Sequence, residues 1–260
     1  MRYHQIAMPP IIERSRPPRL FVAVGLIVLS GCVRDARPTL RVFASASLTA
    51  PFTKIARRFT ELHEGLRVEL HSAGTPQLVM QLRHGALADV FASADLEHMR
   101  RVVEAGHAAG TPKPFARNKL AIVTAPNNDK NITSIEDLVR DDVTCLLCAP
   151  DVPAGRYARR AIQRAKLHVT PVSDEPSVRA VASKIEMGVA DVGVVYQTDA
   201  LAAKDRLRAI SIPEHLNVVA TYPIVSTSSG EQAANADALI SFVLGREGQR
   251  ILSEHGFSSP

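Results

Sequence analysis

The chain has 260 residues, of which 46% are hydrophobic and 22% charged, a composition typical of a globular protein with one large domain or two small ones. Its formal net charge of +5 comes mostly from the first 31 residues, which hold four arginines and one glutamate. The rest of the chain has no basic stripe, so the charge does not indicate nucleic-acid binding. The lack of tryptophan and the 5% aromatic content argue against an aromatic-lined sugar or nucleobase site.

The N-terminal segment is typical of a secretion signal. An apolar run at 20–29 follows several arginines, and it is shorter than the roughly 20 apolar residues that a membrane span needs. Its length fits the apolar core of a signal peptide. The next residues, Leu-Ser-Gly-Cys ending at Cys32, are similar to a bacterial lipobox, in which Cys32 carries the lipid.

We therefore expect residues 1–32 to be a lipoprotein signal peptide and 33–38 to be a polar tether. The mature protein would then lie outside the cytoplasm, anchored to a membrane by the lipid on Cys32. The alternative is an ordinary signal peptide with a chance cysteine. The start codon is open between Met1 and Met8.

Two further cysteines form a C-x-x-C spacing at Cys145 and Cys148, which elsewhere indicates redox chemistry or a metal. Here they lie in an apolar run at 143–148 that predicts a buried strand. Residues three apart on a strand face opposite sides of the sheet. Their Cα atoms would be about 10 Å apart, beyond the reach of a disulfide. We predict two buried thiols.

Strand and helix patterns alternate along the mature chain. The predicted strands are 40–44, 66–70, 89–93, 119–124, 143–148, 191–196, 207–211 and 222–226. The predicted helices are 51–63, 76–83, 95–105, 134–139, 153–165, 178–187, 233–244 and 247–255. We expect Thr75 to cap the helix that Pro76 begins, and Ser134 to cap the short helix that contains Asp137. The alternation predicts an α/β fold with mostly parallel sheets covered on both faces.

Four segments place a small or hydroxyl residue at the start of a predicted helix. They are 46–48, 74–76, 152–155 and 177–179. Helix N-termini offer free N–H groups and a positive dipole end, and ligands of open α/β sheets bind where strands end and helices begin. Several such ends converging on one point would bind a small anion without lysine or arginine.

Six segments in order resemble the molybdate-binding proteins of bacterial ABC transporters. They are FASASL at 43–48, ADVFASAD at 88–95, FARNKL at 115–120, VPAGRY at 152–157, VVY at 194–196 and Gly256-Phe257. The resemblance runs from about residue 40 to 257 and implies a type II periplasmic-binding-protein fold. That fold has two α/β lobes of mixed, mostly parallel sheets flanked by helices, with an oxyanion in the cleft between them.

The resemblance also implies how the chain divides between these lobes. Lobe 1 would comprise 39–117 together with 222–260, and lobe 2 would comprise 118–221. The crossings between them would lie near 115–120 and 220–222.

The resemblance carries five ligand positions over to this chain. Ser47 would donate its hydroxyl and backbone N–H, and Thr75 would keep a hydroxyl where the family usually has serine. Ala154 and Val178 would donate backbone N–H groups, and Tyr196 would donate its phenol O–H. No catalytic residue, no cofactor and no direct bond from protein to molybdenum is implied. Without the resemblance, we would interpret Ser47 and Thr75 as helix caps and Tyr196 as a core residue.

Two arginines, Arg156 and Arg179, lie close to these positions in the sequence. We expect them outside the ligand shell, because a full positive charge would also attract phosphate and other abundant anions. Neutral donors instead select by geometry and donor count. An oxyanion that keeps a proton would place a donor against donors, which is costly when buried.

The implied function is an extracytoplasmic receptor, not an enzyme, that delivers molybdate or tungstate to an ABC permease and its ATPase. It would act as a monomer and bind no nucleic acid. One alternative is a receptor for sulfate, thiosulfate or another oxyanion. The other is a secreted hydrolase using Ser47, although the sequence has no G-x-S-x-G, H-E-x-x-H or Walker-type motif.

Overall fold

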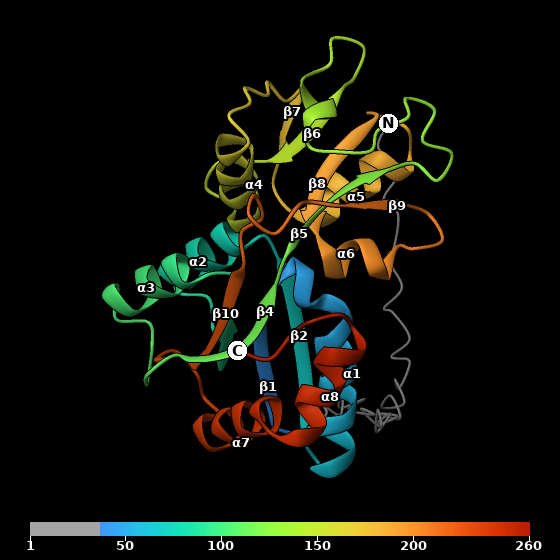
Figure 1. Cartoon of the computed structure of the whole chain (residues 1–260). Coiled ribbons are helices and arrows are strands. Elements are labelled where there is room, and N and C mark those ends of the chain that lie inside the picture. Colours follow the sequence, from blue (N-terminus) through green and yellow to red (C-terminus); the bar gives the residue numbers. More distant parts are fainter. Residues whose placement is uncertain (1–36) are drawn as a thin grey trace, which may run out of the picture. The chain divides into compact units, whose positions relative to one another are not determined.

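The computed structural model describes residues 37–260 (Figure 1). The signal peptide, the lipid-attachment residue Cys32 and most of the tether expected from the sequence lie outside this range. The described residues form a compact unit of their own. None of their helices is both long and apolar enough to span a bilayer.

Strands and helices alternate through the described part of the chain. The strands are β1 (Thr39–Ser45), β2 (Arg67–Ala73), β3 (Val90–Ala92), β4 (Lys113–Asn118), β5 (Leu120–Thr124), β6 (Cys145–Cys148), β7 (Ser173–Glu175), β8 (Val192–Tyr196), β9 (Arg208–Ser211) and β10 (Ala220–Ser226). The helices are α1 (Thr49–Leu62), α2 (Thr75–Arg83), α3 (Leu96–Glu104), α4 (Pro153–Arg164), α5 (Val178–Glu186), α6 (Gln197–Ala202), α7 (Ala233–Leu244) and α8 (Arg246–Glu254), with 3₁₀ turns η1 (Ala46–Leu48) and η2 (Glu136–Val139).

The strands form two five-stranded sheets, in the orders β2-β1-β3-β10-β4 and β7-β6-β8-β5-β9. The predicted α/β class with mixed sheets is confirmed. The expectation of mostly parallel pairing is wrong, because β10 is antiparallel to both β3 and β4, and β5 is antiparallel to both β8 and β9. The chain enters β5 and β10 from the other sheet, at the end of the new sheet where the parallel strands finish. Both strands must therefore run in the direction opposite to those parallel strands.

The chain passes directly between the sheets at Lys119, which separates β4 from β5. It returns in the segment between β9 and β10. Figure 1 shows β4 and β5 as one nearly continuous segment running from one sheet to the other. Asn217 reinforces the crossing, since its side chain accepts from the Leu120 N–H at 3.0 Å and donates to the Leu120 carbonyl at 2.9 Å.

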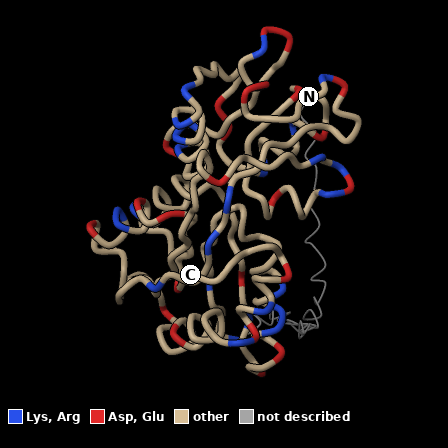
Figure 2. Tube along the Cα trace, in the orientation of Figure 1, with Lys and Arg blue, Asp and Glu red and all other residues tan. Residues whose placement is uncertain are grey.

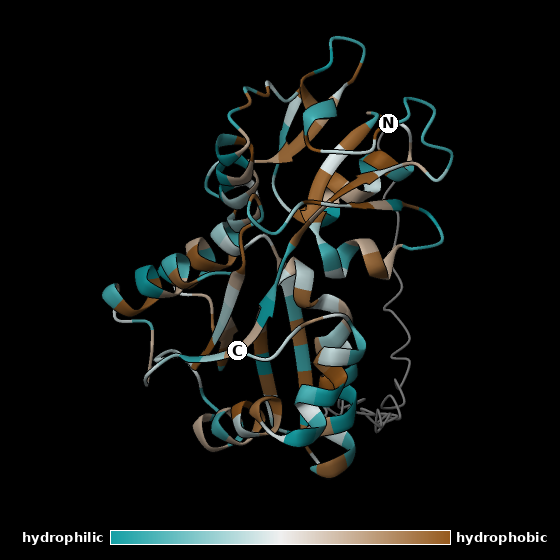
Figure 3. Cartoon of the chain, in the orientation of Figure 1, coloured by the Kyte–Doolittle hydropathy of each residue, from teal (hydrophilic) through white to brown (hydrophobic). Residues whose placement is uncertain are grey.

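Helices cover both faces of the first sheet, because successive side chains of a strand point to opposite faces. Val42 of β1 belongs to the core that includes Phe52 and Phe59 of α1. Phe43, the next residue, packs instead with Leu78 of α2 and its neighbours. Figure 3 shows β6 and β8 of the second sheet as hydrophobic along most of their length, as expected for strands that are buried on both faces.

Three elements were not predicted from the sequence: β4, β7 and α6. β7 has the sequence Ser-Asp-Glu, which carries no apolar pattern, and it exists because β6 pairs with it in parallel. α6 is only six residues long, too short to show a helical period.

Two predicted helix caps are wrong. The N-cap of α2 is Gly74, and Thr75 is already the first helical residue. The N-cap of η2 is Ile135. The Asp137 carboxylate instead turns back and accepts from the N–H groups of Thr133 and Ser134 at 2.8 and 3.0 Å, so it replaces the cap that Ser134 was expected to supply.

Cys145 and Cys148 are free and buried, which confirms the prediction of two structural thiols. Burial raises the pKa of Cys145 to about 12 and raises the pKa of Cys148 further. The nucleophilic form of cysteine is the thiolate, so neither residue is suited to redox chemistry at neutral pH.

Candidate functional site

The structure brings all five predicted ligand residues together around one small cavity. Its lining residues are Ser45, Ala46, Ser47, Gly74, Thr75, Ala94, Val152, Pro153, Ala154, Ser177, Val178 and Tyr196. Its volume is about 10 Å³, which is room for about one water. In this conformation the cavity is too narrow for a sugar or a peptide, so a ligand that all five residues contact must be small.

Three helices begin at this cavity. Thr75 is the first residue of α2, Ala154 is the second of α4, and Val178 is the first of α5. The first N–H groups of a helix have no carbonyl partner within the helix, and the positive end of its dipole lies there. At α5, Ser177 caps the helix by accepting from the Ala180 N–H at 3.3 Å. Because Ala154 and Val178 can contribute backbone groups, their apolar side chains do not prevent them from binding an anion.

Two glycines allow the backbone segments around the cavity to approach closely. A Cβ at Gly155 would lie 2.2 Å from the Ala149 carbonyl oxygen, so the first turn of α4 fits against the end of β6 only without a side chain. A Cβ at Gly74 would lie 2.3 Å from the carbonyl oxygen of Pro176. Gly74 precedes α2 beside the first sheet, whereas Pro176 follows β7 of the second sheet. The wall of the cavity therefore joins the two sheets by direct backbone contact.

The two hydroxyl residues are held by hydrogen bonds and do not act as helix caps. Ser47 Oγ lies 3.0 Å from the Tyr222 hydroxyl. Thr75 Oγ1 lies 2.7 Å from Ser45 Oγ, and Ser45 in turn donates to the Ala92 carbonyl at 3.2 Å. Since Ser45 has one proton, both of its contacts are satisfied together when Thr75 donates to it. In this arrangement Thr75 faces the cavity with its backbone N–H rather than with a free hydroxyl proton.

Tyr196 carries the clearest sign of a ligand site. It ends β8 and is 1% exposed. Within residues 37–260, its hydroxyl is the one buried side-chain oxygen or nitrogen without a hydrogen-bond partner. The Tyr222 hydroxyl lies near enough to influence its pKa, but the pair lacks hydrogen-bond geometry. An unpaired buried polar group costs about 1–3 kcal/mol, so the Tyr196 hydroxyl is an unused donor at the cavity wall.

The protonation state of Tyr196 suits that role. Burial raises its pKa well above the ordinary value, with a smaller contribution from Tyr222. The phenol therefore keeps its proton and remains a donor throughout the physiological pH range.

No charged residue of the described chain lines the small cavity. Arg156, on α4, instead contacts the Asp95 carboxylate, and its Nε lies 3.3 Å from Glu97. Asp95 is the N-cap of α3, beside the first sheet, and is 1% exposed. Arg179 is exposed and lines a different cavity. Both arginines thus lie outside the lining, and Figure 2 shows basic and acidic residues interspersed over the visible part of the chain.

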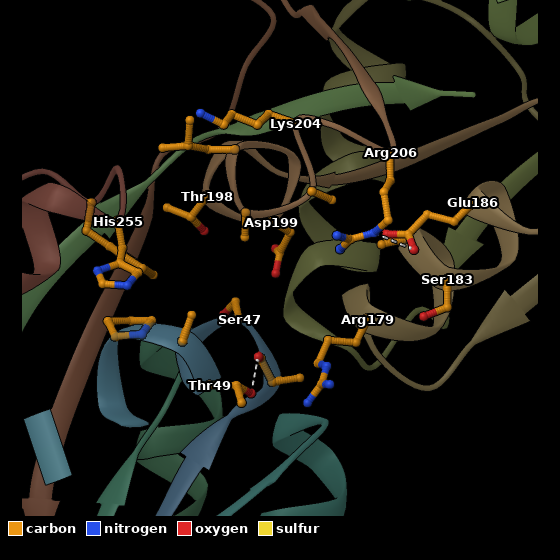
Figure 4. A pocket seen from close by; sticks show the side chains of 18 of the residues that line it. Ser47, Thr49, Arg179, Ser183, Glu186, Thr198, Asp199, Lys204, Arg206 and His255 are labelled. Atoms are coloured by element: carbon orange, nitrogen blue, oxygen red, sulfur yellow. Dashed lines mark hydrogen bonds and ion pairs between the residues drawn. The ribbon is translucent and has the colours of Figure 1, made fainter. Parts of the chain in front are cut away.

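A larger cavity of about 520 Å³ shares only Ala46 and Ser47 with the small one. Figure 4 shows that its labelled side chains come from η1 and the start of α1, from α5, from the α6 region and from the C-terminal segment. Its charges are mixed, and Arg206 pairs with Glu186 at 3.0 Å. Burial raises the pKa of Asp199 to about 7, a shift that Arg179 partly opposes. Mixed charges of this kind do not favour a dianion.

Sequence reasoning missed three residues that support the site: Ser45, Tyr222 and Asn118. Ser45 has a local signal, because it lies two positions before Ser47 at the end of a strand. Tyr222 and Asn118 have none, since they reach Ser47 only through the two segments that connect the sheets. Within residues 37–260, no group of three or more His, Cys, Asp or Glu is placed to hold a metal ion.

Comparisons with known proteins agree with this geometry. The family model described as bacterial extracellular solute-binding protein matches residues 40–258. The molybdate-binding protein ModA of Mycobacterium tuberculosis is 40% identical over 231 residues, covering 89% of this chain and 88% of the relative. The putative ABC transporter substrate-binding lipoprotein YvgL of Bacillus subtilis is 25% identical, covering 92% and 97%.

A solved structure of similar fold is the periplasmic molybdate-binding protein of Azotobacter vinelandii. It has a TM-score of 0.75 at 20% identity and covers 85% of this chain and 99% of that protein. The resemblance seen in the sequence is confirmed, and the chain belongs to the bacterial extracellular solute-binding protein family.

Proposed function

We propose that this protein is the molybdate-binding component of a bacterial ABC importer. The observation that carries the proposal is a small cavity whose lining offers only uncharged donors, among them the unpartnered Tyr196 hydroxyl. The relative from Mycobacterium tuberculosis that is 40% identical carries the name of a molybdate-binding protein, which supports the same ligand. Tungstate, a dianion of similar geometry, would bind at the same place.

Uncharged donors suit this ligand for a physical reason. Hydrogen bonds to a charged acceptor contribute about 1.5–3 kcal/mol each, so several together replace much of the hydration of a dianion. We propose that Ser47, Thr75, Ala154, Val178 and Tyr196 supply them, the oxyanion being held with no direct bond from protein to metal. A ring of donors fixed in size discriminates among tetrahedral oxyanions by their bond lengths.

We propose that the two sheets are the centres of two moving lobes, residues 39–117 with 222–260 and residues 118–221. Ser47 and Thr75 then belong to the first lobe, and Ala154, Val178 and Tyr196 belong to the second. A ligand that touches both lobes stabilises the closed state by its differential affinity for that state. The segments at Lys119 and between β9 and β10 would act as the hinge.

The delivery partner in this proposal is an ABC permease with its ATPase, which the closed monomer would approach outside the cytoplasm. Lipid on Cys32 would hold it at the membrane surface. The Bacillus subtilis relative carries the name of a lipoprotein, which supports this anchor.

The proposal predicts selective thermal stabilisation. For the chain from residue 33 onward, molybdate or tungstate at 100 times Kd should add about 2.7 kcal/mol of stability. For a protein of this size that corresponds to roughly 5–10 °C in the unfolding midpoint. Sulfate and phosphate at the same concentration should give little shift. An equal response to sulfate would favour a general oxyanion receptor, and ester hydrolysis without any oxyanion response would favour a hydrolase.

Two single substitutions should change affinity and stability in different ways. Ser47→Ala should weaken molybdate binding at least tenfold and also destabilise the free protein, because the Tyr222 hydroxyl loses a partner. Tyr196→Phe should weaken binding less, yet raise the stability of the free protein by about 1 kcal/mol, because it removes an unsatisfied buried hydroxyl. Calorimetric titration and denaturant unfolding measure the two effects. Unchanged titrations for both variants would remove these residues from the site.

A further inference from the structure

The direction of one hydrogen bond decides what Ser47 can offer a ligand. Its Oγ lies 3.0 Å from the Tyr222 hydroxyl, and either oxygen can be the donor. A serine hydroxyl has one proton. If Ser47 donates to Tyr222, its oxygen presents lone pairs to the cavity. If Tyr222 donates to Ser47, the serine proton is free for a ligand.

Asn118 favours one of these directions. The backbone N–H of Lys119 donates to Asn118 Oδ1 at 2.9 Å, which fixes the orientation of the amide. Its Nδ2 group therefore faces Thr198 Oγ1 at 2.8 Å and the Tyr222 hydroxyl at a longer 3.4 Å. An amide NH₂ group can only donate. The Tyr222 oxygen can accept on that side, and the neighbouring Tyr196 hydroxyl has no hydrogen-bond partner. Ser47 is therefore the acceptor that remains for the Tyr222 proton.

Tyr222 is well placed to keep this arrangement. Its ring is fully buried among Phe115, Tyr196 and Phe257, at centroid distances of 6.3, 5.7 and 5.4 Å. Burial raises its pKa well above the ordinary value, so it retains the proton that it donates. It lies on β10, directly after the segment that returns the chain to the first sheet.

We propose that Tyr222, oriented by Asn118, is a positioning residue that makes Ser47 a donor toward the cavity and so excludes oxyanions that carry a proton. The inference rests on the proposed function. With Ser47 fixed as a donor, the O–H of hydrogen phosphate would meet another O–H, and one buried donor would stay unpaired. Molybdate has no proton and meets no such conflict.

The test is the ratio of two dissociation constants, for molybdate and for hydrogen phosphate, measured by calorimetry at mildly alkaline pH. Both ions are dianions there, so a change of charge in the protein affects them alike. Tyr222→Phe keeps the ring and its packing but leaves the Ser47 hydroxyl free to turn and accept a proton. We expect molybdate binding to weaken by less than tenfold, because the freed Ser47 hydroxyl can still donate to the ion and only its fixed orientation is lost. Hydrogen phosphate binding should strengthen, so that the dissociation constant for hydrogen phosphate divided by that for molybdate falls at least tenfold.

A second variant should reverse the direction of the hydrogen bond between Ser47 and Tyr222 instead of removing that bond. In Asn118→Asp, one carboxylate oxygen can still accept from Lys119, and the other attracts the Tyr222 proton. Ser47 would then donate to Tyr222, and its lone pairs would face the ligand. The dissociation constant for hydrogen phosphate divided by that for molybdate should fall again, although both ions should bind more weakly beside the added negative charge. Tyr157→Phe is the matched control, because it deletes a phenol hydroxyl of α4 that does not line the cavity, and it should leave the ratio unchanged.

The outcomes separate the two proposals. A wild-type protein that binds no molybdate overturns the proposed function. A wild-type protein that binds molybdate, combined with a Tyr222→Phe variant that still excludes hydrogen phosphate as strongly, overturns the positioning role alone. Proportional weakening of both ions in the two variants does the same, because it reports a general loss of affinity.

Discussion

Replacing Gly74 by alanine should weaken molybdate binding by about 5- to 150-fold, the range that corresponds to the 1–3 kcal/mol cost of an overpacked contact. The added Cβ would lie 2.3 Å from the Pro176 carbonyl oxygen, a backbone atom that cannot turn aside. The clash arises only where the start of α2 meets the segment before α5. It therefore acts on the proposed closed state and not on either sheet by itself.

The same substitution should leave the stability of the free protein intact. Gly74 has φ −57° and ψ 139°, a conformation that alanine adopts without strain. Alanine also lowers the entropy of the unfolded chain, which stabilises the fold by about 0.4–1 kcal/mol at compatible positions. Calorimetric titration and thermal unfolding together separate a closure defect from a folding defect.

Gly110→Ala is the matched control. A Cβ there meets only the Ser226 hydroxyl oxygen, at 3.8 Å, so binding should not change. If Gly74→Ala bound molybdate as tightly as the wild type, the contact between Gly74 and Pro176 would not belong to the ligand-bound state.

Arg156→Gln should weaken molybdate binding by about tenfold or more, although Arg156 does not line the cavity. Its guanidinium on α4 contacts the Asp95 carboxylate on α3, and that carboxylate is 1% exposed. Hydrogen bonds to a charged group contribute about 1.5–3 kcal/mol. Because α3 and α4 flank different sheets, we expect the pair to stabilise the proposed closed state, and its loss should appear as faster ligand dissociation in stopped-flow measurements.

Arg101→Gln is the control that separates the effect of a buried ion pair from that of an exposed one. Arg101 of α3 also contacts Asp151, which lies just before α4, at 2.8 Å, but both side chains are 40% or more exposed. Exposed ion pairs contribute about 0.2–1 kcal/mol, so dissociation should accelerate by no more than a few fold. Equal effects of the two substitutions would show that the buried Asp95 pair has no special part in closure. A double variant with Asp95→Asn should recover part of the loss if the two residues act as a pair.

The five candidate ligand positions came from a family resemblance, whereas the reason they can act together came from the fold. The sequence showed four helix starts with small or hydroxyl residues. It did not show that Ser47 and Thr75 have different partners, the first contacting the Tyr222 hydroxyl and the second the Ser45 hydroxyl. That difference depends on partners whose places are set by β10 and β1.

By itself, the sequence determined the elements with a strong local pattern, such as β1, α1, β8 and α7, and the burial of Cys145 and Cys148. Hydrophobic periodicity and helix-start chemistry are properties of a few consecutive residues, so they can be read locally. Only the tertiary structure decided that β5 and β10 run antiparallel to their neighbours and that the polar segment β7 is a strand. It also decided that Ser47 meets Tyr222, 175 positions away, and that Asp95 meets Arg156, 61 positions away. These contacts require the chain to cross twice between the sheets, and no local pattern of side chains specifies where two distant backbone segments will meet.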